Sequence, residues 1–240
     1  NGNKLYTSGA EGADYVFLAV RTDPDVPKHK GISILVAETS DPGFSRGDIH
    51  TMGGVHTNVT YYENVKVPLD MIIGAENAGW RLITEQLNHE RIGLAAWGIQ
   101  GWKIFRDVMN WVHDTKGADG QRVIDNPGAQ RNLAEVYAHL EAMRVMNARM
   151  SWQLDQEEMS PVFPSAIKVY STEIILEICR LLMDVVGPHS LIAGDSEGAV
   201  LYGNLEHEYR RATINTFGGG VVEVLRGLVA THGLGMPQHR

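Results

Sequence analysis

Apolar residues in the first part of the chain gather in short runs, which is the pattern of β-strands. Three runs are rich in β-branched and aromatic residues, at 15–20, 32–36 and 59–67. Turn-forming residues separate them, and Pro68 follows the third run, where it would stop a strand. We therefore expect residues 1–68 to form part of a β-domain.

Beyond an expected linker at residues 69–77, the apolar spacing changes to the three-and-four pattern of an α-helix. It first runs as one stripe from Trp80 to Val112, which we interpret as one long helix. The pattern predicts further helices at about 129–157, from Pro161 or Pro164 to Gly187, at 200–211, and from Gly220 to His232. Residues 78–240 are accordingly expected to form an up-and-down helical bundle, which makes the fold class α+β.

The composition is that of an ordinary globular chain and argues against several kinds of partner. Of 240 residues, 43% are apolar, and the single Cys179 cannot form an intrachain disulfide, which favours a reducing, cytoplasmic location. Lys and Arg total 21 against 29 Asp and Glu, without a basic run, so nucleic acid is not an expected partner. No apolar stretch reaches the roughly 20 residues that a bilayer requires, so no membrane span is expected.

One glutamate stands out in a sequence that lacks HExxH, CxxC, GxGxxG and P-loop motifs, and no metal site is expected. Glu90 lies on the apolar stripe, three residues after Leu87 and four before Leu94. A carboxylate there costs free energy unless it has a partner or a function. Helix geometry alone favours a buried ion pair with an arginine of another helix over catalysis. Arg91 is not that partner, because adjacent helical residues point apart.

Three consecutive glycines, at 218–220, form the second unusual feature. They precede a helical pattern, so their backbone N–H groups could face a phosphate or carboxylate, and the missing Cβ atoms permit close approach. A flexible entry into an ordinary helix explains the same residues equally well.

Several segments have the order and spacing of a known family. They read KLYTSGA (4–10), RTD (21–23), KHKGIS (28–33), VKVP (65–68), GAENAGW (74–80), LNHER (87–91) and TFGGG (216–220). Through them the chain resembles the acyl-CoA dehydrogenase family over nearly its whole length. The family's amino-terminal helical domain and the first half of its β-domain are absent. The sequence also starts without an initiator methionine, so we expect the carboxy-terminal part of a longer subunit.

The resemblance implies a reaction and a cofactor. Family members bind FAD between the β-domain and the bundle and oxidise an acyl-CoA thioester to the trans-2-enoyl product. A carboxylate removes the α-proton, the β-hydrogen passes as hydride to flavin N5, and an electron-transfer flavoprotein takes the electrons. Homologous subunits assemble as homo- or heterotetramers. The expected partners are therefore acyl-CoA, an electron-transfer flavoprotein and a homologous subunit.

The resemblance also implies roles for individual residues. Most members keep the base in a Tyr-Glu-Gly-Thr loop before the last helix, where this chain reads Phe217-Gly218-Gly219 without a carboxylate. A minority carry the base on the first bundle helix, immediately before an arginine, and that position is Glu90. The resemblance thus favours Glu90 as the catalytic base, with Arg91 and Gly218 as substrate-binding residues. The expected cofactor-binding residues are Tyr6, Thr7, Ser8, Gly218 and Gly219.

Two family elements for FAD are altered. The Arg-x-Gln-Phe segment is replaced at residues 117–122, and the Gln-x-x-Gly-Gly element is changed at 183–188. An assembly of two different but related subunits would explain both losses. This chain would supply Glu90 and residues 6–8, which match the family strand that contacts the flavin ring, and its partner would supply the Arg-x-Gln-Phe segment that contacts the FAD pyrophosphate. That arrangement resembles the heteromeric acyl-CoA dehydrogenases of steroid side-chain breakdown. A non-catalytic partner subunit and a flavin-dependent acyl-CoA oxidase are the alternatives.

Overall fold

The computed structural model describes residues 1–93, 97–156 and 162–237. They divide into two compact units, Asn1–Leu87 and Asn88–Arg240. The division falls inside helix α1 (Gly79–Gly93), the first helix after the strands. The three sequence-based ranges, 1–68, 69–77 and 78–240, stay a prediction about domains.

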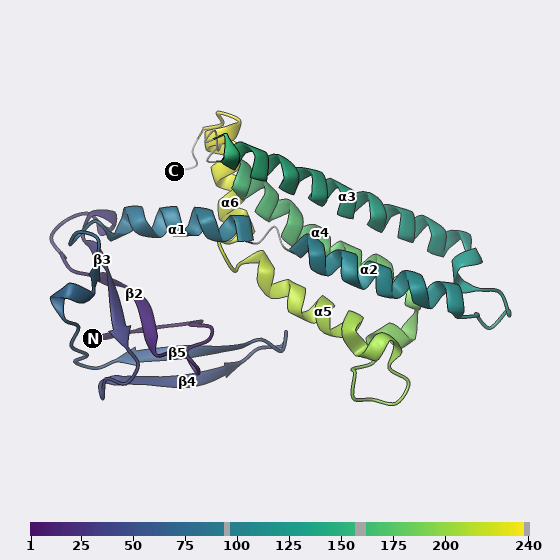
Figure 1. Cartoon of the computed structure of the whole chain (residues 1–240), viewed down its shortest axis with the longest axis horizontal. Coiled ribbons are helices and arrows are strands. Elements are labelled where there is room, and N and C mark those ends of the chain that lie inside the picture. The colour runs from purple at the N-terminus through teal and green to yellow at the C-terminus, as the bar shows by residue number, and fades with distance from the viewer. Residues whose placement is uncertain (94–96, 157–161, 238–240) are drawn as a thin grey trace. The chain divides into compact units, whose positions relative to one another are not determined.

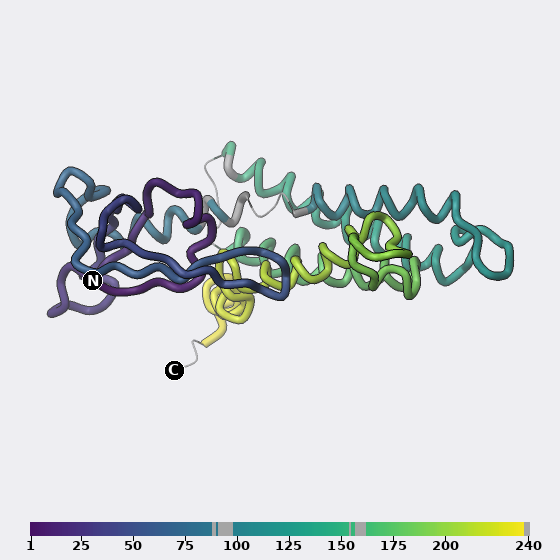
Figure 2. The backbone as a smooth tube through the Cα atoms, turned by 90° about the horizontal axis from the view of Figure 1, so that it is seen from below, coloured from purple at the N-terminus to yellow at the C-terminus, as the bar shows by residue number. Residues whose placement is uncertain are grey.

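The first unit holds two three-stranded antiparallel sheets. One has the order β1 (Gly2–Lys4), β5 (His56–Tyr62), β4 (Phe44–His50); the other has the order β2 (Tyr15–Arg21), β3 (Ile32–Glu38), β6 (Ile72–Ile73). Along β2 the side chains of Val16 and Leu18 are buried while Tyr15 and Phe17 are exposed, the period of two that one covered face requires. Figure 2 shows the β4–β5 hairpin as two adjacent tubes.

The strands agree only partly with the sequence pattern. The runs at 15–20 and 32–36 are strands β2 and β3, as predicted. The third expected strand is displaced towards the amino terminus and ends at Tyr62, because Asn64 has a left-handed φ of 57° that breaks the extended chain. Strands β1, β4 and β6 were not predicted, since β4 is largely polar and the other two are very short.

The second unit is a helical bundle with α4 at its centre. Its helices are α2 (Trp97–Asp114), α3 (Pro127–Asp155), α4 (Phe163–Val186), α5 (Asn204–Ala212) and α6 (Val222–Leu228). Helices α2, α3, α5 and α6 all pack on α4 (Figure 1). The stripe predicted on α3 is buried in the core, at Leu133, Val136, Leu140 and Met143. The α+β class and the helical bundle are therefore confirmed.

Three helices differ from the prediction. The helix expected from residue 200 begins only at Asn204, because Leu201 and Tyr202 have left-handed φ values of 54° and 56°. The single helix expected from residue 80 to 112 is described as α1 and α2, with residues 94–96 between them outside the described part of the chain. The last helix ends at Leu228 and continues as a π-helical turn, Val229–Gly233. Gly227 in its final α-turn is a weak helix former, which suits an early end. No described helix is both long and apolar enough to cross a membrane.

Candidate functional site

The expected flavin-ring residues Thr7 and Ser8 lie beside strand β5 and are fixed to it. The Thr7 N–H donates to the Asn58 carbonyl at 2.9 Å. The hydroxyls of Thr7 and Thr60 are 3.2 Å apart, and the Ser8 hydroxyl donates to that of Thr57 at 3.3 Å. Each hydroxyl retains acceptor capacity beyond these contacts. The segment is therefore a rigid polar edge, which suits the hydrogen-bonding rim of a flavin ring.

Tyr6 holds an unusual backbone conformation just before this edge. Its φ is 63°, and its side chain is 66% exposed. A bulky residue in the left-handed region costs about 1–3 kcal/mol, and such residues gather at ligand-contacting segments. The contact of this residue with a planar cofactor stays a prediction.

A polar network fixes the start of α1, the helix that carries Glu90. The Asn77 N–H donates to Ser33 Oγ at 2.8 Å, and Thr22 Oγ1 donates to Asn77 Oδ1 at 2.5 Å. The hydroxyls of Thr22 and Ser33 are 2.7 Å apart, and Ser33 is the donor there because Thr22 has given its only proton to Asn77. At Gly79 a Cβ atom would lie 2.8 Å from the Ile32 carbonyl oxygen, so only glycine allows this close approach.

Glu90 lies in the last turn of α1 and is exposed. Ile83 and Leu87, which precede it on the stripe, are half-buried. Among the ion pairs that join described side chains, none includes Glu90. The side chain of Arg91 lies outside the described residues. The position of Glu90 on the stripe implied a buried carboxylate, and the exposed side chain contradicts that expectation. The ion pairs among described side chains give no support to a structural pair, and the role of Glu90 as the base stays a prediction.

The glycine segment forms a defined loop between a 3-10 turn, Thr213–Thr216, and α6. The Gly218 N–H donates to the Ile214 carbonyl at 3.0 Å, and the Gly220 N–H donates to that of Phe217 at 3.2 Å. Gly219 and Gly220 have φ values of 68° and 116°, which favour glycine. Because turn contacts occupy two of the amides, the loop does not offer a full set of N–H groups to a phosphate.

A buried lysine, which was not among the predicted site residues, holds this loop. Lys168 of α4 donates through Nζ to the carbonyls of Thr216, at 3.1 Å, and Gly220, at 2.6 Å. The signal was present, because Lys168 continues the stripe of Ile175, Ile178 and Leu182 on α4. It is the same pattern of a charge on an apolar stripe that drew attention to Glu90.

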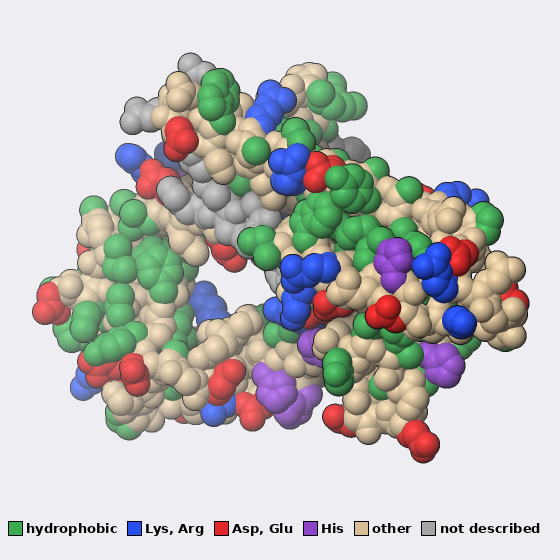
Figure 3. All heavy atoms as spheres, turned by 45° about the vertical axis from the view of Figure 1, so that its right-hand side comes forward, with side chains coloured by type: hydrophobic (Ala, Val, Ile, Leu, Met, Phe, Trp, Pro, Cys, Tyr) green, Lys and Arg blue, Asp and Glu red, His purple; other side chains and the backbone are tan. Residues whose placement is uncertain are grey.

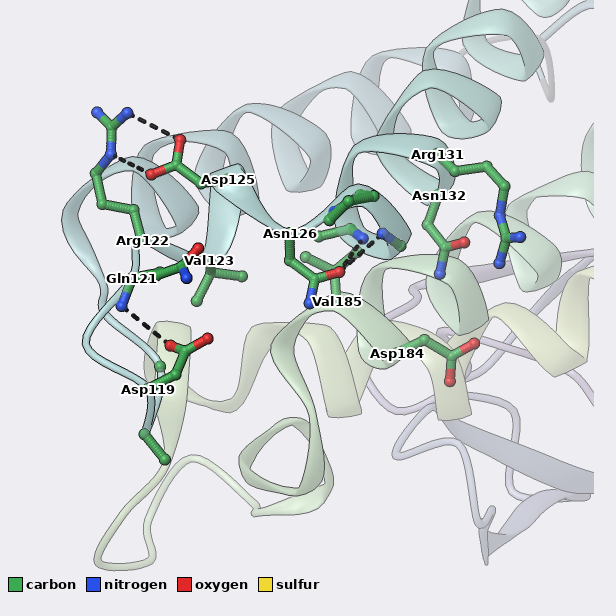
Figure 4. Close-up of a pocket in the computed structure, with 15 residues that line it drawn as sticks. Asp119, Gln121, Arg122, Val123, Asp125, Asn126, Arg131, Asn132, Asp184 and Val185 are labelled. Carbon is green, nitrogen blue, oxygen red and sulfur yellow. Dashed lines mark hydrogen bonds and ion pairs between the residues drawn. The ribbon is translucent and has the colours of Figure 1, made fainter.

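A cavity of about 730 Å³ lies between the α2–α3 connection and α4, where the family's Arg-x-Gln-Phe segment is missing (Figure 4). Its charged lining consists of Asp119, Asp125, Asp184, Arg122 and Arg131. Arg122 binds Asp125 through two 2.9 Å hydrogen bonds, which hold the pKa of that carboxyl below its ordinary value. Three carboxylates against two guanidiniums, one already paired, do not fit a pyrophosphate.

Acidic and basic side chains are interspersed on the face of the molecule in Figure 3. The described residues contain no cluster of three or more His, Cys, Asp or Glu side chains placed to hold a metal ion.

Comparison with known proteins gives the family. Residues 77–234 match the model of the acyl-CoA dehydrogenase C-terminal domain, and the chain belongs to the acyl-CoA dehydrogenase family. It is 42% identical to the acyl-CoA dehydrogenase FadE26 and 41% identical to FadE29, both of Mycobacterium tuberculosis, over 99% of its length.

Two solved structures are similar over the whole chain. The Tcur3481–Tcur3483 steroid acyl-CoA dehydrogenase shares 46% identity with a TM-score of 0.94, and the ChsE4–ChsE5 complex of Mycobacterium tuberculosis shares 44% identity with a TM-score of 0.92. The chain spans 61% of each of these structures, and 61% and 60% of FadE26 and FadE29.

Proposed function

We propose that the protein is a subunit of an FAD-dependent acyl-CoA dehydrogenase that forms a trans-2-enoyl-CoA, with Glu90 as the base. The observation that carries the proposal is the accessible Glu90 on α1, within the LNHER segment, in a chain whose glycine loop has no carboxylate. A base needs only to reach the α-carbon of the substrate, so it can come from α1 or from the loop before α6.

The chain's own residues have separate tasks in this proposal. The Glu90 carboxylate takes the proton from the carbon next to the thioester carbonyl, which is acidic because the carbonyl stabilises the developing enolate. Gly218 and Arg91 are the proposed substrate-binding residues, and Gly218 leaves room for the substrate because it has no side chain. Tyr6, Thr7, Ser8, Gly218 and Gly219 are the proposed cofactor-binding residues, with the first three serving the flavin ring. Bound FAD supplies the hydride-accepting chemistry.

We further propose that a homologous second subunit completes the FAD site. The acidic cavity beside Asp184 would repel a pyrophosphate, so the phosphate-binding side belongs on another chain. The two similar solved structures carry names of paired proteins, and one of them is a steroid acyl-CoA dehydrogenase. Both facts support a heteromer acting on a bulky, steroid-type acyl-CoA, with an electron-transfer flavoprotein as acceptor.

Glu90→Gln tests the catalytic role, with Glu223→Gln on α6 as the matched control. Both variants are purified in complex with the homologous subunit, and enoyl-CoA formation is measured with an electron-transfer flavoprotein. The proposal expects Glu90→Gln to lose turnover while flavin content is kept, and Glu223→Gln to remain active. Normal turnover by Glu90→Gln would instead identify a non-catalytic partner subunit.

Two further measurements separate the remaining alternatives. Flavin absorbance per protomer of the co-purified complex tests the shared site, and a homotetramer with full flavin occupancy would refute the mixed assembly. Oxygen consumption without an electron-transfer flavoprotein would favour an acyl-CoA oxidase.

A further inference from the structure

Lys168 is a fully buried cation inside the bundle, with 1% of its surface exposed. It lies near the start of α4, and its Nζ donates to two main-chain carbonyls that are remote in sequence, those of Thr216 and Gly220. Burying an ammonium group is costly unless hydrogen bonds replace its hydration. These two contacts provide such replacement.

The two acceptors stand on either side of the glycine loop. Thr216 is the last residue of the 3-10 turn, and Gly220 comes just before the start of α6. Residues 217–219 therefore lie between two carbonyls that the same nitrogen binds, so Nζ fixes the separation of the two loop ends. Charged hydrogen bonds of this kind are stronger than those between neutral groups.

The loop needs an external constraint because of its composition. Three consecutive glycines lose more conformational entropy on ordering than any other residues would. The loop's own backbone contacts are few: the amides of Phe217 and Gly218 donate to the Ile214 carbonyl at 3.3 and 3.0 Å, and that of Gly220 donates to the Phe217 carbonyl at 3.2 Å. Side-chain packing contributes little, because Phe217 is exposed.

We infer that Lys168 is a positioning residue for the active site, acting through the conformation of residues 217–220. The inference rests on the proposed function, in which Gly218 and Gly219 border the substrate and the cofactor. Lys168 touches neither of them in this scheme. It keeps the loop backbone in one conformation, so that the space left by the missing Cβ atoms stays open for the thioester.

The test replaces Lys168 with methionine in the complex with the homologous subunit. Lys168→Met keeps an unbranched chain and removes the donor. Ser171→Ala is the matched control, because Ser171 is equally buried on α4 and its hydroxyl has no partner among the described residues. Hydrogen exchange of the peptide spanning 214–222, enoyl-CoA turnover and the thermal midpoint are measured for each complex.

We expect the Gly218 and Gly220 amides to exchange about tenfold or more faster in Lys168→Met, the factor that loss of a charged hydrogen bond implies. We also expect kcat/KM to fall in Lys168→Met. Ser171→Ala should match the unsubstituted complex in both loop exchange and kcat/KM. Unchanged exchange of the loop overturns the inference. Two other results would overturn it: faster exchange that is spread evenly along α4, or faster exchange of the loop with unchanged kcat/KM.

A second variant covers a failure of Lys168→Met to assemble. Lys168→Gln keeps a shorter, neutral donor, and its loop exchange should fall between those of the methionine variant and the unsubstituted complex. The exchange measurement does not depend on turnover. If the proposed role of Glu90 is wrong, Glu90→Gln will have normal activity. If the proposed role of Lys168 is wrong, loop exchange will not change in Lys168→Met, so the two failures are distinguishable.

Discussion

Asn77 and Ser33 are joined by a hydrogen bond of 2.8 Å, from the main-chain N–H of one to the side-chain hydroxyl of the other. Asn77 has a left-handed φ of 63° and precedes α1, while Ser33 is the second residue of β3. The contact therefore ties the start of the helix that bears Glu90 to the middle strand of a sheet.

Ser33→Ala should destabilise the first unit. Ser33 is completely buried, and its removal leaves the Asn77 amide without its acceptor and Thr22 without a donor. We expect a loss of about 1–3 kcal/mol in the free energy of unfolding, measured by urea titration. The exposed Ser45 on β4 provides the control, Ser45→Ala, which should stay within about 0.5 kcal/mol. Equal midpoints for the two variants would contradict the importance of the network.

Gly79→Ala should also be harmful, for a steric reason. The added Cβ would lie 2.8 Å from the Ile32 carbonyl oxygen and 2.9 Å from the Ser33 carbonyl carbon, both main-chain atoms that cannot turn away. We expect a loss of about 1–3 kcal/mol by thermal unfolding. The matched Gly227→Ala change meets no atom within 4 Å and should stabilise α6 by about 0.5–1 kcal/mol. The prediction fails if both glycines tolerate alanine alike.

Gly101 and Leu140 should behave as a coupled pair at the contact of α2 with α3. A Cβ on Gly101 would lie 2.8 Å from Leu140 Cδ2, the end of a fully buried side chain. Gly101→Ala should cost about 1–3 kcal/mol and Leu140→Ala about 2–5 kcal/mol. The double variant should cost less than the sum, because the new methyl group occupies space that the leucine vacates. Simple additivity in urea unfolding would argue against this packing.

Cys179 should be unreactive in the folded protein. Burial raises the pKa of its thiol from 9.0 to about 12, so almost no thiolate forms at pH 8. Iodoacetamide should label the thiol only after denaturant is added, and Cys179→Ala serves as the blank. Rapid labelling of the native complex would show that α4 opens locally.

The same shift gives a pH dependence with a definite sign. Below pH 9 the thiol is protonated in both states, and its stabilising contribution is fully present. Between pH 9 and about 12 the unfolded chain releases the proton first, so the free energy of unfolding falls as pH rises. Cys179→Ala should flatten that part of the stability profile, and identical slopes would contradict the shift.

The sequence predicted what depends on local periodicity and missed what depends on distant pairing. The stripe of Val136, Leu140 and Met143 indicated α3 because one helix needs only its own spacing to show a buried face. Strand β4 carries no such signal, since its sequence, FSRGDIH, is largely polar and its place is fixed by pairing with β5. Pro68 marked the end of the third predicted strand only roughly, because β5 ends at Tyr62 and Asn64 turns the chain, and strand β6 follows after Pro68.

In the candidate site, too, local sequence spacing indicated some features, while contacts between distant segments were missed. Glu90 drew attention as a charge on an apolar stripe, but its side chain is exposed and its role stays a prediction. Lys168 carried an equal signal that the family resemblance did not highlight, and its side chain is buried. The Thr22 and Ser33 contacts with Asn77 join parts of the chain about fifty residues apart, and no pattern in the sequence indicates them.

The central place of α4 has a consequence for how the bundle opens. Since α2, α3, α5 and α6 each rest against it, we expect the buried part of α4 to be the last part of the bundle whose amides meet solvent. Their deuterium uptake should therefore report complete unfolding, and every destabilising change elsewhere in the bundle should register there in proportion to its cost. Deuterium uptake of α4 alone would thus measure the free energy of unfolding of the whole bundle.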